Sequence, residues 1–242
     1  MRHQENIVWQ RVGAIGVLSL HNPPENLIEE PEFVKKERLE EIFHENGLKG
    51  IIIKGTGRHF SAGADMNKLK QLAQNKTLLS KKMINGKKII RLIENMDVPV
   101  VAVISGVCFG AGLEIALASH IRVCSENAIF AFPETNYGIM PGLGGTVMLT
   151  KLIGSGKSAE IILSGDIVNA PRALELKLVD HVVPTKELQD FSMRLLNRLT
   201  TDRDIDVIRS VMRSIHNADI LSFEIALEKE TKLFCSLAVK DM

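Results

Sequence analysis

The chain has 242 residues, of which 45% are hydrophobic and 24% are charged, and its formal net charge is +1. This near balance of acids and bases creates no overall field that would attract nucleic acid or a membrane surface, so neither is expected as a partner. The N-terminal residues lack the apolar run of a signal peptide, and no apolar stretch is long enough to cross a membrane, so we expect a cytoplasmic protein.

Short β-type runs alternate with helical patterns through most of the chain. The β-type runs are expected at residues 15–20, 50–54, 98–105, 121–124, 128–132 and 178–183. Amphipathic helices are expected over residues 32–45 and 81–96. Strands that alternate with helices predict the α/β class.

The pattern changes after Pro184. Residues 188–199, 205–215 and 221–237 are typical of amphipathic helices, with no strand between them. We therefore divide the chain into a core of residues 1–185 and a helical region of residues 186–242. An independently folded second domain is not required, and an oligomer-forming helical extension fits equally well.

Cysteine and histidine give no sign of a metal or redox site. The three cysteines, Cys108, Cys124 and Cys235, are widely spaced and form no C-x-x-C pair. We interpret them as free thiols in a reducing compartment. The histidines are scattered without an H-x-x-x-H pair, so no metal site is expected.

Three segments concentrate glycine where strands are expected to end, at residues 55–66, 105–114 and 133–146. Such segments are either tight strand-to-helix junctions or loops whose free amides approach a ligand. None has the G-x-G-x-x-G order of a dinucleotide site. A phosphate loop near residue 156 is also excluded, because Lys151 stands where that motif requires glycine, and residues 154–158 are interpreted as a turn and helix start.

Two glutamates accompany these segments. Glu114 is surrounded in sequence by apolar residues, so its carboxyl is expected in a poorly solvated space that raises its pKa. Glu134 follows a strand that ends at Pro133. Either acid alone is more often a helix cap or an ion-pair partner, but two carboxylates in one apolar cleft would have different pKa values and could serve as acid and base.

The three glycine segments, H-F-S-A-G-A-D-M, G-A-G-L-E and P-E-T-N-Y-G-I-M-P-G-L-G-G-T, resemble those of the crotonase, or enoyl-CoA hydratase and isomerase, family. The resemblance covers most of the chain to about Pro184 and is densest over residues 58–146. It implies an α/β fold, a crotonase-type spiral of ββα units with a C-terminal helical trimerisation region.

The resemblance also implies roles for single residues. The backbone amides of Ala64 and Ala111 would form an oxyanion hole for a thioester carbonyl, with Ala111 at the start of a helix, and Glu114 and Glu134 would be catalytic. Substrate-binding positions would be Ala62, Asp65, Met66, Asn67 and Gly142. The wall of the acyl pocket is expected from Met66, Leu69 and Leu72.

Possession of both glutamates favours an enoyl-CoA hydratase, which adds water across the double bond of a 2-enoyl thioester through an enolate. An enoyl-CoA isomerase or another acyl-thioester enzyme of the family is the first alternative, and a non-catalytic acyl-CoA-binding homologue is the second. The substrate would be an acyl-CoA or a carrier-protein thioester, with no cofactor because coenzyme A is part of the substrate. The resemblance further implies a homotrimer or homohexamer.

Two positions depart from the family's usual residues. His120 stands where relatives usually have an aspartate, and Lys177 replaces a common glycine. We expect both residues to be structural.

Overall fold

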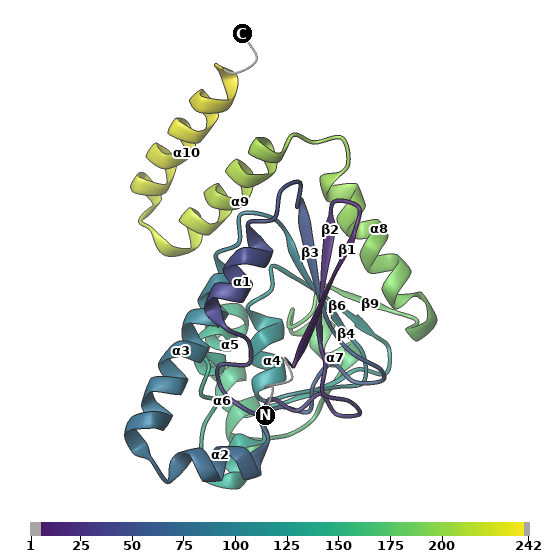
Figure 1. Ribbon diagram of the computed structural model, residues 1–242, viewed down its shortest axis with the longest axis vertical. Helices are drawn as coiled ribbons and strands as arrows, with labels where there is room; N and C mark the ends of the chain where they lie inside the picture. Colours follow the sequence, from purple (N-terminus) through teal and green to yellow (C-terminus); the bar gives the residue numbers. More distant parts are fainter. Residues whose placement is uncertain (1–5, 240–242) are drawn as a thin grey trace.

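The computed structural model describes residues 6–239, and its framework is a six-stranded sheet with the order β1-β2-β3-β4-β6-β9 (Figure 1). β1 and β2 pair antiparallel, and all later neighbours pair parallel. The strands are β1 (Ile7–Val12), β2 (Ile15–Leu20), β3 (Gly50–Gly55), β4 (Val100–Ile104), β6 (Ile121–Ser125) and β9 (His181–Val183).

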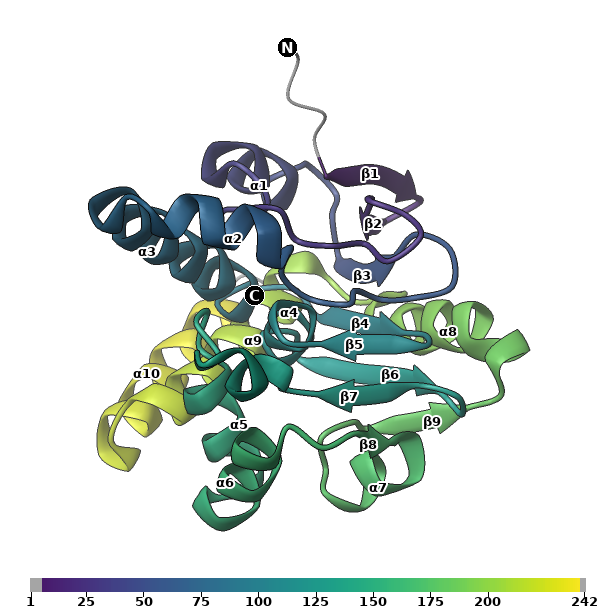
Figure 2. The ribbon, with the colours of Figure 1, turned by 90° about the horizontal axis from the view of Figure 1, so that it is seen from below.

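A smaller sheet has the order β5-β7-β8. Its strands are β5 (Val107–Phe109), β7 (Ile129–Ala131) and β8 (Val168–Asn169). The chain runs from β4 to β5 and then to helix α4 (Ala111–Leu117), and later from β6 to β7, the 3-10 helix η1 (Pro133–Tyr137) and α5 (Gly145–Ile153). Figure 2 shows β5 beside β4 and β7 beside β6, so the predicted α/β spiral of ββα units is confirmed.

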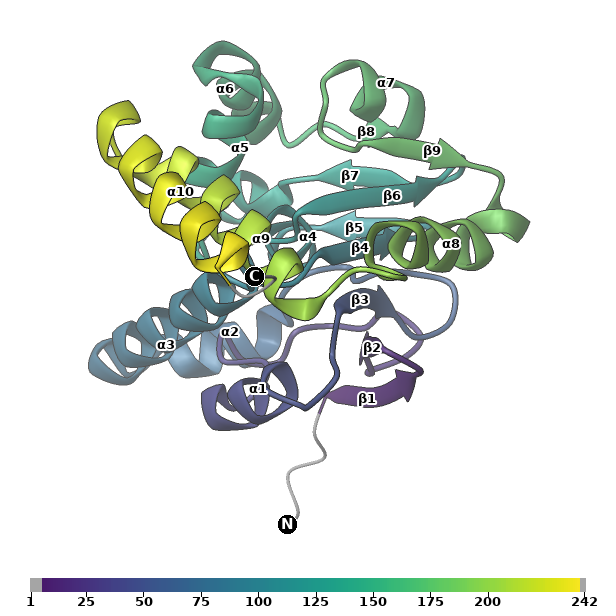
Figure 3. The same ribbon diagram turned by 90° about the horizontal axis from the view of Figure 1, so that it is seen from above.

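Both faces of the large sheet are covered. The main core lies between one face and helices that include α1 (Lys36–Phe43), α3 (Lys76–Glu94) and α4. The other face packs on α8 (Leu188–Thr200), which follows the short η2 (Thr185–Glu187) (Figure 3). Burial on both faces explains why strands such as β4 are uninterrupted apolar runs.

The predicted C-terminal helices are confirmed as α8, α9 (Ile205–Ile220) and α10 (Phe223–Ala238). Their packing differs. α8 belongs to the core of the sheet, α9 contributes Ile208 and Met212 to the main core, and α10 packs on α9 without a buried side chain. The described part of the helical region, residues 186–239, therefore does not pack as one unit, and its role in oligomerisation stays a prediction.

The sequence patterns did not predict β1, β5, β8, α2 (Met66–Ala73), α5 or α7 (Ala170–Glu175), whereas the helix start near residue 154 is confirmed by α6 (Ser155–Ser164). The strand predicted at 178–183 is shorter in the structure. The amides of Leu178 and Val179 donate to the carbonyl of Ala173 and belong to the turn after α7, so β9 begins only at His181. Among the described residues, no helix combines the length and apolar character needed to span a bilayer.

Candidate active site

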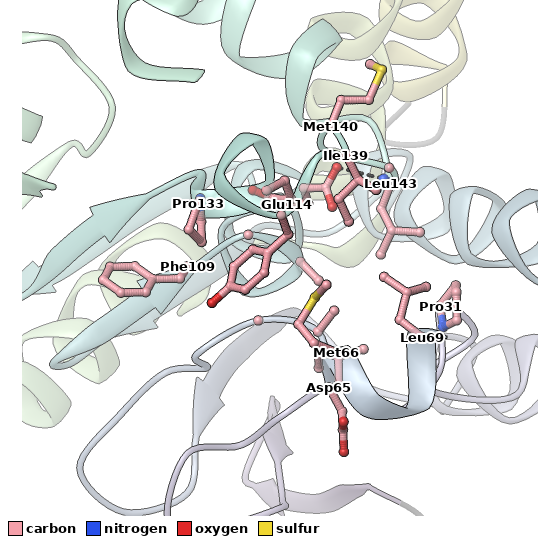
Figure 4. Close-up of a pocket in the computed structure, with 18 of the residues that line it drawn as sticks. Pro31, Asp65, Met66, Leu69, Phe109, Glu114, Pro133, Ile139, Met140 and Leu143 are labelled. Carbon is pink, nitrogen blue, oxygen red and sulfur yellow. Dashed lines mark hydrogen bonds between the residues drawn. The ribbon is translucent and has the colours of Figure 1, made fainter. Parts of the chain in front are cut away.

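A cavity of about 460 Å³ brings together almost all of the predicted site residues (Figure 4). Those that line it are Ala62, Ala64, Asp65, Met66, Ala111, Glu114, Glu134 and Gly142. Asn67 does not line it, because this residue is exposed on α2 and its backbone amide donates to Asp65 Oδ1 at 2.8 Å. The substrate-binding role of Asn67 stays a prediction.

Ala64 presents its amide to this cavity because of the way its segment pairs. The carbonyl of Gly63 accepts from the amide of Ile28, and the amide of Asp65 donates to the carbonyl of Ile28. In extended chain, successive N–H groups point to opposite sides. The N–H of Ala64 therefore points away from Ile28, and it has no backbone acceptor within residues 6–239, so it is available to a ligand.

Ala111 is the first residue of α4, where helical geometry provides no acceptor for the amide within the helix. The preceding Gly110 has φ 48°, in the left-handed region that favours glycine. A Cβ atom on Gly110 would also lie 2.7 Å from Glu134 Oε1. Glycine is thus required at this turn both by its backbone angle and by the neighbouring carboxylate.

Gly63 brings the two amide-bearing segments together. Its φ is 96°, and a Cβ atom there would lie 2.9 Å from the carbonyl oxygen of Phe109 and 3.7 Å from the amide nitrogen of Ala111. The segment before Ala64 therefore packs directly on the turn that starts α4. This is the arrangement that the predicted pair of oxyanion donors requires.

The carboxyl of Glu114 is fixed by the backbone of the third glycine segment. Its Oε1 accepts hydrogen bonds from the amides of Leu143 at 2.6 Å and Gly145 at 2.7 Å, and the residue is only 1% exposed. Burial raises the pKa of Glu114, and the amide bonds oppose this shift. The charged form thus has strong donors although it lies in an apolar space.

Glu134 reaches the same cavity because β5 and β7 are parallel neighbours. Phe109 pairs with Ala131, and the amide of Gly110 donates to the carbonyl of Ala131, so the chain after each strand emerges at the same end of the small sheet. Glu134 Oε2 is buried and has no hydrogen-bond partner among the described residues. Burial, with a smaller effect of the charge on Glu114, raises the pKa of Glu134 to about 7.

The two carboxyls therefore suit different tasks. Glu114 is held by two donors that favour its charged form, which is the state of a base. Glu134 keeps its proton to near neutral pH and has an oxygen without a partner, which is the state of an acid. A carboxyl with two amide donors and a carboxyl with a raised pKa thus share one cavity with the amides of Ala64 and Ala111.

Other lining residues refine the predictions. Asp65 caps α2 by accepting from the amides of Asn67 and Lys68, so its carboxylate has a structural task. Met66 and Leu69 line the cavity as predicted, but Leu72 does not, because Met66, Leu69 and Ala73 share the helix face that meets it. Sequence reasoning missed the contribution of α3, whose inner face supplies Leu79 and Met83, and of Tyr137, Ile139, Met140 and Leu143.

The two departures from the family's usual residues have structural contacts. His120 Nδ1 accepts from the amide of Val100 at 3.0 Å, its Nε2 lies 3.2 Å from the carbonyl oxygen of Glu94, and burial lowers its pKa to about 4. Lys177 has φ 60°, in the left-handed region where glycine is favoured. Neither residue lines the cavity.

No group of three or more histidine, cysteine, aspartate or glutamate side chains in the described part of the chain could hold a metal ion. The spiral fold, the two free amides and the paired carboxyls have the arrangement that acid-base catalysis with a stabilised oxyanion requires.

Comparison with known proteins identifies the family. The sequence profile described as enoyl-CoA hydratase/isomerase matches residues 10–242, so the chain belongs to the enoyl-CoA hydratase/isomerase family. It is 32% identical to a probable enoyl-CoA hydratase of Bacillus subtilis over 223 residues, which cover 91% of this chain and 85% of that protein. It is 30% identical to a short-chain-enoyl-CoA hydratase of Clostridium acetobutylicum over 237 residues, covering 95% and 88%.

The fold agrees with this assignment. The crystal structure of an enoyl-CoA hydratase from Thermoplasma volcanium superposes with a TM-score of 0.85 and 27% identity, covering 98% of this chain and 93% of that chain. The crotonase-type fold expected from the sequence is thereby confirmed.

Proposed function

We propose that the protein hydrates 2-enoyl-CoA thioesters. The observation that carries this proposal is the meeting of an amide-bound carboxylate, Glu114, with a carboxyl whose pKa is raised to about 7, Glu134, beside the free amides of Ala64 and Ala111. The names of the relatives support the same activity.

The reaction follows from these positions. Glu114 takes a proton from a water molecule, whose oxygen forms a bond to the β-carbon of the double bond. The electron pair of the double bond moves toward the thioester, and the oxyanion accepts hydrogen bonds from the amides of Ala64 and Ala111. Glu134 then gives its proton to the α-carbon, and the product is a 3-hydroxyacyl thioester.

The test compares Glu114→Gln and Glu134→Gln with the wild-type enzyme. Crotonyl-CoA hydration is followed by loss of the enoyl absorbance, and binding of saturated butyryl-CoA is measured by calorimetry. Each substitution removes an acid-base group, so we expect the rate to fall by about 10² to 10⁴ with binding kept. Equal turnover by the wild type and both variants would show that the carboxyls do not perform this reaction. Binding of butyryl-CoA without any hydration by the wild type would identify a non-catalytic acyl-CoA binder.

Isomerisation of 3-enoyl-CoA is a second candidate, favoured by the unpartnered Oε2 of Glu134. This one carboxyl could move a proton between two carbons without water. Product analysis distinguishes the two: an isomerase keeps activity on 3-enoyl-CoA in Glu114→Gln, whereas a hydratase loses hydration in both variants.

The remaining parts of the proposal concern substrate, assembly and location. We propose free acyl-CoA as the substrate, in line with the named relatives, with a carrier-protein thioester as the alternative, and no further cofactor. A homotrimer or homohexamer is supported by exposed apolar side chains on α9 and α10, such as Ile215 and Phe234. A cytoplasmic location is supported by the buried free thiols of Cys108 and Cys124.

A further inference from the structure

The cavity has an apolar side that a thioester's acyl group would enter. Glu114 lies near its middle, with Leu69, Pro31 and Leu143 on one side and Phe109 and Pro133 on the other (Figure 4). The side with Leu69 and Leu143 also receives Leu79 and Met83 from the inner face of α3. An acyl chain gains free energy by leaving water for such a surface, and this side adjoins the carboxyls because the amide of Leu143 binds Glu114.

Met83 crosses this side of the cavity very close to the reacting groups. A Cβ atom on Gly142 would overlap with Met83 Cε, so the end of the methionine side chain packs directly on the backbone of Gly142. The next residue, Leu143, is the one whose amide binds Glu114 at 2.6 Å. Met83 therefore covers the backbone at Gly142, one residue before the amide of Leu143 that binds Glu114.

The helix that carries Met83, α3, cannot easily move outward, because it packs on and pairs with the loop around Pro31. A Cβ atom on Gly86 would overlap with the carbonyl oxygen of Pro31 and would lie 2.7 Å from Leu143 Cδ2, so the helix is in contact there. Lys82 Nζ pairs with Glu30 at 2.7 Å and with the carboxylate of Glu32 at 3.4 Å. These contacts fix the helix axis, and the flexible methionine side chain is left as the part that can yield.

We propose that Met83 sets the limit on acyl chain length, making short 2-enoyl thioesters the preferred substrates. The inference rests on the proposed function for the reaction itself, but the size limit is a property of the cavity and applies to binding as well. A shorter side chain at position 83 opens space along Gly142 and Leu143 for further methylene groups. A larger side chain closes that space.

The test measures kcat/KM for crotonyl-, hexenoyl-, octenoyl- and decenoyl-CoA with the wild type, Met83→Ala and Met83→Phe. Each buried methylene contributes about fourfold. We expect Met83→Ala to raise the ratio of octenoyl- to crotonyl-CoA activity roughly tenfold, and Met83→Phe to lower it.

Two matched variants serve as controls. Ile84→Ala removes the adjacent side chain on the outer face of α3, which is 53% exposed, and is expected to leave the ratio unchanged. Met83→Leu conserves volume and is also expected to leave it nearly unchanged, which separates a size effect from a loss of stability.

The proposal is overturned if Met83→Ala leaves the ratio unchanged, or if Ile84→Ala changes it equally. It is also overturned if Met140→Ala, at a rim residue that is 61% exposed, changes the ratio and Met83→Ala does not, because longer chains would then leave by the rim. Should the wild type hydrate none of the substrates, the affinities for saturated butyryl- and octanoyl-CoA decide the question. A higher affinity for octanoyl-CoA relative to butyryl-CoA in Met83→Ala would uphold the size limit while the proposed hydration fails, and an unchanged or lower ratio would overturn the limit.

Discussion

Substitution of Glu134 by glutamine should make the protein more stable at neutral and alkaline pH. Burial raises the pKa of this carboxyl from 4.5 to about 7, so its ionisation is more costly in the folded state than in the unfolded state. The stability of the wild type is therefore unaffected by this group below about pH 4.5, falls as the pH rises from about 4.5 to about 7, and stays at the lower level above that.

The size of the effect follows from the shift. Each pKa unit corresponds to about 1.4 kcal/mol, which sets a ceiling of about 3 kcal/mol for Glu134. Glu134 is only half-buried and lines the cavity, so solvent reduces this cost and we expect about 2 kcal/mol. Glutamine has no charge to bury, and Glu134→Gln should regain this amount above pH 7 while losing hydration activity.

The assay is urea unfolding of both proteins by circular dichroism at several pH values. His120 titrates in the same range, because its lowered pKa destabilises the folded state as the pH falls from about 6.5 to about 4. Both proteins contain His120, so its contribution cancels in their difference. Glu228→Gln, at an exposed position, is the control for removal of a surface charge. A difference between wild type and Glu134→Gln that does not grow between pH 4.5 and 7 would refute the reasoning.

Three further predictions concern the site and one strained turn. The kcat/KM for hydration should fall as the pH rises through about 7, because Glu134 must carry the proton, and a profile measured from pH 5.5 to 9 would show this limb. Ala111→Pro should fold, because proline is accepted at the first helical position, but should lower kcat by about 10² to 10³ through loss of one oxyanion donor. Lys177→Gly should raise the free energy of unfolding by about 0.5–1 kcal/mol, because φ there is positive, as measured by urea unfolding.

Each of these has its own contrary result. A rate that is level from pH 6 to 9 would mean that another group supplies the proton. Ala111→Ser retains the amide and should retain most activity, so an equal loss in both Ala111 variants would assign the effect to packing. An unchanged or lower stability of Lys177→Gly would mean that contacts of the lysine outweigh the strain of its backbone.

The fold class, the main helices and the burial of Glu114 could all be predicted from local patterns. Glu114 is conspicuous in the sequence because an acid among apolar neighbours is expensive to bury without a partner. Its partners are backbone amides of Leu143 and Gly145, and backbone groups carry no sequence signature. The family resemblance predicted Gly142 at the site, and Gly142 lines the cavity, but the sequence could not show which amides bind the carboxylate.

The meeting of Glu114 with Glu134 could not be predicted from spacing, because it depends on a long-range contact. The two acids come together because Phe109 in β5 pairs with Ala131 in β7, so that the segments following both strands emerge at the same end of the sheet. The inner wall from α3 was missed for a similar reason. Its positions 79 and 83 fit an ordinary amphipathic helix, and only the packing shows that they face a cavity instead of the core.

Leu143 contacts both the carboxyl of Glu114 and the apolar side of the cavity. Its amide binds Glu114 at 2.6 Å, and its side chain packs against α3 at Gly86 on the apolar side of the cavity. An acyl chain on this side of the cavity would therefore contact the same residue whose amide binds the proposed base. Binding energy from the unreactive end of a substrate can in this way hold the base in its productive position, which is how remote contacts contribute to kcat as well as to KM.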